Sequence, residues 1–147
     1  MKKSKKYLLK INSLKSGWRD RDYVLLHASF QILVDFMEGE EPGKIIDWSY
    51  DKPHRHAWRE MRLLYSWWKN KRQARRDPFN DKRSLHPPRQ FEKIAGVAAV
   101  RLIEPDKKKY AAYYRALKRG ARLEEKWFEE DQKNLHRLIN VRIFLWT

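Results

Sequence analysis

Hydrophobic side chains recur every three or four residues near the start of the chain, which predicts an amphipathic helix over 22–38. Tyr23, Leu26 and Phe30 follow this spacing. Further apolar residues lie on the other sides of the same helix, so we expect it to be central and covered by neighbours. Gly39 is a suitable residue to end it.

A second helix is predicted over 54–75, and its faces can be counted at 100° per residue. Ala57 and Met61 belong to a narrow apolar stripe. Trp58 and Tyr65 lie on the border between the two faces. The cations opposite the stripe are Arg55, Arg59, Arg62 and Lys69. The pattern therefore predicts a basic ridge edged by aromatic side chains.

Beyond Lys69 the second helix carries cations on all sides, and almost nothing in 71–76 can be buried. We therefore expect the end of this helix to project beyond the core, and Asp77 with Pro78 to stop it.

The second half of the chain is less regular. Residues 97–103 fit either a strand or part of a third helix that starts at Pro88, and a long helix is predicted over about 106–137. The apolar segment 139–146 fits a final helical turn or a strand paired with 97–103. The fold class is thus mainly α, a compact domain of about four helices with a minor β pairing near 97–103 and 139–146.

The length of 147 residues favours one domain, which we expect to be helical over 21–147. The basic charge of the first residues predicts an N-terminal arm over 1–20. The arm holds Lys2, Lys3, Lys5 and Lys6, which fit a solvated tail or a nucleic-acid contact. No cysteine is present, which excludes disulfides and thiol catalysis. No signal peptide or membrane span is recognised, so we expect a cytoplasmic protein that does not bind a membrane.

The formal net charge of +15 predicts an anionic partner. Arginine outnumbers lysine six to two over 55–76, and arginine makes bidentate contacts to phosphate. Aromatic rings beside cations can stack on bases. The predicted nucleic-acid-binding residues are Arg55, Arg59, Arg62, Lys69, Arg72, Arg75, Arg76, Trp58 and Tyr65. In the alternative interpretation, the tryptophans belong to the core and the arginines pair with the acidic stretch 35–51.

Two further groups of residues are candidate sites. The first is a basic patch of Lys107, Lys108, Lys109, Arg115, Lys118, Arg119 and Arg122, interleaved with Tyr110, Tyr113 and Tyr114. The second is a histidine cluster, in which His54, His56 and Glu60 have the ligand types of zinc or manganese. His27 and Asp35 lie on the first helix, where His27 also fits a hydrogen-bonded core residue. No cofactor is expected, because no cofactor-binding motif is found.

Two stretches resemble small uncharacterised proteins of tailed bacteriophages: DYVLLHASFQILVDF at 22–36, and HAWREMRLLYSWW at 56–68 followed by 72–78. The resemblance covers about 20–80. It implies a viral protein, in the host cytoplasm or in the virion, and it supplies no catalytic residues.

These observations favour a non-catalytic protein that binds nucleic acid or a nucleoprotein assembly. One alternative is a protein-binding module, a virion component or host-factor inhibitor whose basic face meets an acidic protein. Another is a metal-dependent nuclease that uses His54, His56 and Glu60. A homo-oligomer is a further expectation, in which an exposed Trp67 and the apolar C-terminal segment cover a second subunit.

Overall fold

The computed structural model describes residues 8–77, 79 and 86–146. The contacts divide the chain into two compact units. Unit 1 comprises Met1–Ala74 with Glu129–Thr147, and unit 2 comprises Arg75–Phe128. The part of the chain that is described holds four α-helices and one two-stranded sheet, which confirms the mainly α fold class. The lysines predicted for the basic arm, at positions 2, 3, 5 and 6, lie outside the described residues.

Helix α1, Arg21–Gly39, is the central helix of unit 1 and confirms the prediction over 22–38. Its buried residues include Phe30 and Leu33, which are completely shielded from solvent. Each buried apolar side chain of this size stabilises the fold by about 2 kcal/mol. The helix ends where the N–H of Glu40 bonds the carbonyl of Phe36.

Helix α3, Lys52–Ser66, follows the short helix α2, Pro42–Ile45. The carboxylate of Asp51 accepts a hydrogen bond from the backbone N–H of His54 and so caps the first turn. The predicted apolar stripe is confirmed, because its members are buried: Ala57, Met61 and Leu64.

The helix predicted over 54–75 does not continue as a regular α-helix. It passes into the π-helix η1, Trp67–Lys71, and residues 72–74 form a turn. The π turn accompanies the burial of two consecutive tryptophans, Trp67 at 8% exposure and Trp68 at 2%. The prediction of an exposed Trp67 was therefore wrong, since its ring lies 5.3 Å from the ring of Phe30 in the core.

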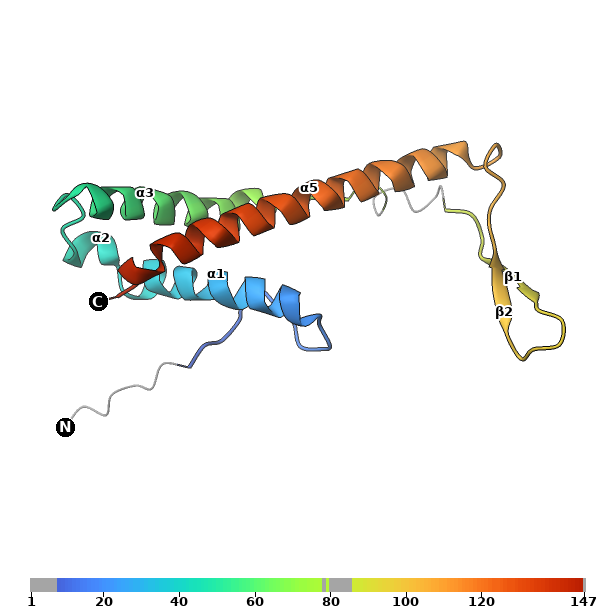
Figure 1. Ribbon diagram of the computed structural model, residues 1–147, viewed down its shortest axis with the longest axis horizontal. Helices are drawn as coiled ribbons and strands as arrows, with labels where there is room; N and C mark the ends of the chain where they lie inside the picture. Colours follow the sequence, from blue (N-terminus) through green and yellow to red (C-terminus); the bar gives the residue numbers. More distant parts are fainter. Residues whose placement is uncertain (1–7, 78, 80–85, 147) are drawn as a thin grey trace. The chain divides into compact units, whose positions relative to one another are not determined.

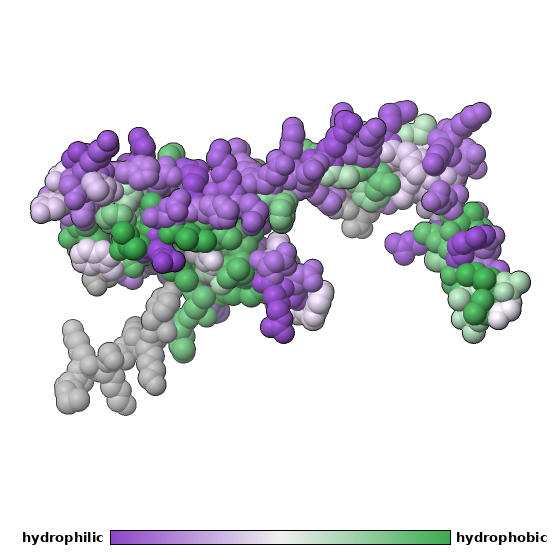
Figure 2. Space-filling model, viewed as in Figure 1, coloured by the Kyte–Doolittle hydropathy of each residue, from purple (hydrophilic) through white to green (hydrophobic). Residues whose placement is uncertain are grey.

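The core of unit 1 lies between α1, α3, η1 and the last turns of α5, Ala111–Val141 (Figure 1). Phe30 and Trp68 stack with ring centroids 4.5 Å apart and an interplanar angle of 8°. From α5, Leu138 and Val141 complete the cluster. Figure 2 shows hydrophilic side chains over the outer side of α3 and hydrophobic residues between α3 and α1. The apolar stripe of α3 thus faces the core, and its basic face points to solvent.

Unit 2 holds the hairpin of β1, Gln90–Lys93, and β2, Val100–Ile103. The strands are antiparallel, with Phe91 opposite Leu102. A strand near 97–103 is confirmed, whereas its predicted partner 139–146 and the alternative helix from Pro88 were wrong. Residues 139–141 end α5 and Arg142–Phe144 form the 3-10 helix η3, so helical bonds occupy their backbone.

Helix α5 confirms the long helix predicted over 106–137, with a later start at Ala111 and an end at Val141. Residues 111–128 belong to unit 2 and residues 129–141 to unit 1. Within the described ranges, no helix has both the length and the hydrophobicity needed to cross a membrane.

Candidate nucleic-acid interface

One side of α3 borders a groove of about 910 Å³ in unit 1, called the α3 groove below. Its lining residues are Met37, Trp48, Ser49, Arg55, Trp58, Arg59, Arg62, Leu63, Tyr65 and Ser66. Five of the nine residues predicted to bind nucleic acid are among them: Arg55, Arg59, Arg62, Trp58 and Tyr65. The structure therefore brings the basic face and the aromatic border of α3 together at one surface.

The three arginines of the groove are exposed. They lie on successive turns of α3, and their Cα positions span about 10 Å along the helix axis at 1.5 Å per residue. Arg55 donates from Nη1 to the carbonyl of Ser49 at 2.9 Å, and Arg59 donates from Nη2 to Nδ1 of His56 at 3.4 Å. None of the three forms an ion pair with any residue that the structure describes.

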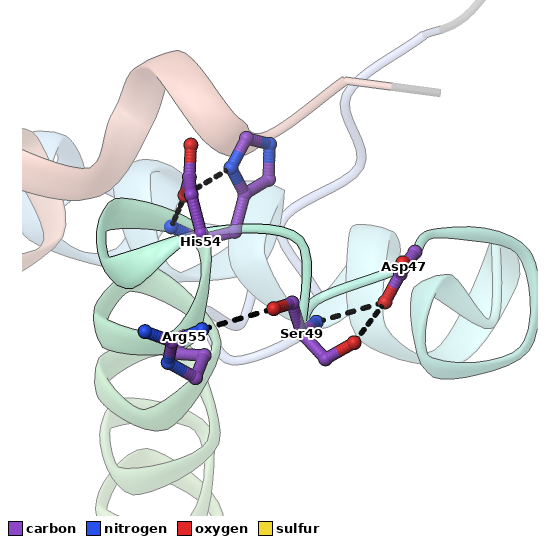
Figure 3. A network of polar contacts seen from close by, with 5 residues as sticks. Asp47, Ser49, His54 and Arg55 are labelled. Carbon is purple, nitrogen blue, oxygen red and sulfur yellow. Dashed lines mark hydrogen bonds and ion pairs between the residues drawn. The ribbon is translucent and has the colours of Figure 1, made fainter.

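A hydrogen-bond network before α3 fixes the position of Arg55 (Figure 3). The backbone N–H and the hydroxyl of Ser49 both donate to Oδ1 of Asp47, at 2.9 and 2.5 Å. These bonds hold the pKa of Asp47 below its ordinary value, because they favour the carboxylate. The carbonyl of Ser49 then accepts from Arg55. One end of the basic face is thus anchored to a hydrogen-bonded turn.

Trp58 forms the aromatic wall of the groove. Its ring stacks on Trp48, with centroids 5.0 Å apart and an interplanar angle of 11°. Trp48 is held in turn by a hydrogen bond from its Nε1 to the carbonyl of Pro42 at 3.0 Å. Gly43 passes close to Trp58, since a Cβ at this position would lie 3.1 Å from Cζ2 of the ring. The ring of Trp58 is therefore held in place by neighbours from the α2 segment.

Tyr65 lines the groove with its hydroxyl already bound. That hydroxyl donates to Oε1 of Glu38 at 2.7 Å, which lowers the pKa of Glu38 and raises the pKa of Tyr65. Lys69 pairs with the same carboxylate oxygen at 3.0 Å. Glu38 belongs to the acidic stretch 35–51, so the charge of Lys69 is matched inside unit 1, whereas the alternative interpretation assigned this stretch to the arginines.

Arg72 lies in the core region of unit 1, away from the lining of the α3 groove. Its guanidinium donates to both carboxylate oxygens of Asp131 at 3.2 and 3.1 Å, and its Cζ lies 4.6 Å from the ring centroid of Trp68. Lys71 pairs with Glu130 at 2.8 Å. The prediction that this end of the helix projects beyond the core was wrong, because carboxylates of α5 meet its cations.

Arg75 and Arg76, the last two predicted contacts, belong to unit 2. Arg75 donates to the carbonyl of Trp127 at 3.4 Å and lies 5.7 Å from the centroid of that ring. Arg76 is exposed. Neither residue lines the groove of unit 1.

The predicted metal ligands have separate partners. His54 binds Asp51 through Nδ1 at 2.7 Å, and Glu60 accepts two hydrogen bonds from Arg137 at 2.7 and 3.1 Å. The pKa of Glu60 is lowered mainly by these bonds. Among the residues that the structure describes, no three histidine or acidic side chains are grouped as metal ligands. The structure thus does not assemble His54, His56 and Glu60 into a site.

His27 is a hydrogen-bonded core residue, which confirms that interpretation over a role in the histidine cluster. It is 3% exposed, and its Nδ1 lies 2.7 Å from the hydroxyl oxygen of Ser13. Burial, with the nearby charge of Arg72, lowers the pKa of His27 to about 4. Asp35 accepts a hydrogen bond from the amide of Gln31 at 2.7 Å, and neither Asp35 nor His27 belongs to a group of three or more candidate metal ligands among the described residues.

The second basic patch lies in unit 2 and at the start of α5. Its cations on the helix are exposed: Arg115, Lys118, Arg119 and Arg122. The hydroxyl of Tyr114 donates to the carbonyl of Pro105 at 2.8 Å, and Tyr113 packs against Phe79. Two of the patch's tyrosines thus serve local packing.

Sequence reasoning missed the residues that complete the α3 groove, namely Met37, Trp48 and Leu63. Trp48 lies within an irregular loop, where no periodicity assigns its side chain to a face. Leu63 is 52% exposed, although it is large and apolar. Its place on the basic side of α3, away from the apolar stripe, was the available signal.

Comparison of the whole chain with protein families, with curated proteins and with solved structures finds no match. The resemblance of 20–80 to proteins of tailed bacteriophages therefore stays a prediction, and the case for a function depends on the geometry of the α3 groove.

Proposed function

We propose that the protein binds nucleic acid without catalysis and that the α3 groove is its contact surface. The observation that carries the proposal is the row of Arg55, Arg59 and Arg62, exposed on successive turns and without an ion pair to any carboxylate in the described part of the chain. Phosphates neutralise such a row and release counterions. Each guanidinium can also hold a phosphate through two hydrogen bonds.

The surroundings of the row support an external anion as its partner. Solvated protein surfaces commonly carry cations beside carboxylates. Three cations outside the groove follow this pattern: Lys44, Lys71 and Arg101 pair with Glu41, Glu130 and Glu92. The arginines of the groove lie beside aromatic and apolar side chains instead. Three like charges at this spacing repel one another, and an anion that bridges them removes this repulsion.

The test is binding of labelled single-stranded and duplex DNA and RNA between about 50 and 200 mM salt, with the triple variant Arg55→Gln, Arg59→Gln, Arg62→Gln. Each phosphate contact contributes about −0.7 to the log–log salt slope on a single strand and about −0.9 on a duplex. We expect the triple variant to bind more weakly and to lose about 2 to 3 units of slope.

The matched control is the triple variant Lys44→Gln, Lys71→Gln, Arg101→Gln. It removes the same three charges from cations that are already paired. We expect it to keep most of the slope. Equal loss in both variants, or unchanged binding in the groove variant, would overturn the proposal. Weak binding that does not depend on salt for every nucleic acid would favour an acidic protein as the partner.

A further inference from the structure

We infer that the α3 groove receives an unpaired base, so that the protein prefers single-stranded nucleic acid to a duplex. This inference depends on the proposed function. A convex row of arginines fits the phosphates of either form. The α3 groove beside the row distinguishes single-stranded from duplex nucleic acid, because it is lined by Trp58, Leu63 and Met37. In a duplex the base faces are stacked on one another, and only an unpaired base can offer its face to a protein ring.

Trp58 has the properties of a stacking platform. Trp48 covers one face of its ring, with centroids 5.0 Å apart, and Trp48 is itself held by its hydrogen bond to the carbonyl of Pro42. Stacking on a ring that is already ordered costs little conformational entropy. Since Trp48 covers one face of Trp58, a base would stack on the other face.

Arg62 supplies a second plane at the same place. Its Cζ lies 6.0 Å from the ring centroid of Trp58, and its side chain is exposed. Guanidinium planes stack on bases as aromatic rings do. A base that enters beside Trp58 can therefore contact both the indole and the guanidinium, while its phosphate meets Arg59 or Arg55 on the preceding turns. This arrangement couples base stacking to phosphate binding in a single nucleotide site.

The apolar walls add to the argument. Leu63 is 52% exposed on the polar side of α3, where it has no role in the core. Met37 packs against the core cluster and also lines the groove. A thioether and a leucine side chain fit the edges of a planar ring without specific hydrogen bonds. The groove is therefore suited to any base, and we expect little sequence preference.

The experiment compares three ligands with the full chain: a single-stranded DNA of about twelve nucleotides, its duplex, and a strand of the same length that contains abasic sites only. We expect the single strand to bind at least about tenfold more tightly than the abasic strand. Trp58→Leu should lose most of this preference and keep its affinity for the abasic strand. Trp146→Leu, an exposed tryptophan outside the groove, is the matched control and should behave as the unmodified protein.

Arg62→Lys is a second variant that keeps the charge and removes only an exposed planar group. We expect it to weaken single-strand binding and to leave the salt slope unchanged. If the protein binds none of the three ligands at low salt, the proposed function itself fails. If it binds all three equally, or if Trp58→Leu and Arg62→Lys both match Trp146→Leu, nucleic-acid binding stands and the base site is overturned.

Discussion

The start of α3 and the π turn that continues it carry the same kind of residue but use it differently. Arg55, Arg59 and Arg62 are exposed, and no carboxylate that the structure describes pairs with them. Arg72 is enclosed, with only 11% of its side chain exposed, and it binds Asp131 through both oxygens. One helical run thus has a basic face available to a ligand at its start and a basic end that belongs to the fold.

Neighbouring helices cause this difference. Near η1, the carboxylates of Glu38 from α1 and of Glu130 and Asp131 from α5 neutralise three cations. Along the groove, the lining residues other than the arginines carry no charge. Asp51 and Glu60 form their hydrogen bonds with His54 and Arg137 instead, and these bonds lower the pKa values of both carboxylates, to which the charges of Arg55 and Arg59 also contribute. A basic helix face is therefore a candidate for an anionic ligand only where no carboxylate forms an ion pair with it.

Replacing Arg72 is the strongest test of this contrast. Arg72→Met leaves the enclosed Asp131 without its guanidinium and removes the contact over Trp68, so we expect the free energy of unfolding to fall by about 3 to 4 kcal/mol. Urea unfolding measures this loss. Arg59→Met, the matched change in the groove, should alter stability by less than about 0.5 kcal/mol. Equal stability of the two variants would contradict the division of the helix into two functions.

The pH dependence of stability tests the enclosed region through His27. The pKa of His27 is about 4 in the folded chain and 6.5 for an ordinary histidine, so the unfolded chain binds the proton first as pH falls. Stability contributed by the neutral ring is complete above pH 6.5 and is lost as pH falls toward about 4. The shift corresponds to about 3 kcal/mol.

The measurement is the free energy of unfolding of the unmodified chain minus that of His27→Phe, followed from pH 7.5 to pH 4. A difference that does not change over this range would show that burial of His27 has no effect on its titration. Arg72→Met sharpens the test, because the charge of Arg72 contributes to the lowered pKa. In this variant we expect a smaller pH-dependent loss.

Among the paired cations, the smallest loss of stability is expected at Lys69, which is paired like Arg72 but exposed like the groove arginines. Its ion pair with Glu38 is half exposed, at 45% and 48% of the two side chains. Lys69→Met should therefore lower the free energy of unfolding by at most about 1 kcal/mol, and less at high salt. Urea unfolding at low and high salt measures both values. A loss as large as that of Arg72→Met would mean that the exposure of an ion pair does not determine its contribution to the free energy of unfolding.

The helical period predicted what depends on local sequence. It gave α1 almost to the residue, the buried stripe of Ala57 and Met61, and the face on which Arg55 lies. It could not give the π turn, because a count at 100° per residue assumes a regular helix. It also could not give the pair of Arg72 and Asp131, since 59 residues separate the partners and no local rule aligns α5 with η1.

The positions of aromatic residues in loops were a second feature that could not be predicted from the sequence. Trp48 has no periodic neighbours, yet it supports Trp58 and lines the groove. The hairpin shows the same limit, because local spacing identified the strand at 97–103 but not its partner at 90–93. The sequence contains seven tryptophans, and no local pattern assigned which of their rings would remain at the surface.

The unpaired state of Arg55, Arg59 and Arg62 has a consequence for how this protein can diverge over generations. Under the proposed function, we expect a change at any of the three to alter ligand binding while the fold keeps its stability, so that each substitution can be selected on its own. A change at Arg72 must instead be accompanied by one at Asp131, because either alone weakens the fold. We therefore expect the proposed ligand preference of the α3 groove to change faster in evolution than the ion pairing between the end of η1 and α5, on which the fold depends.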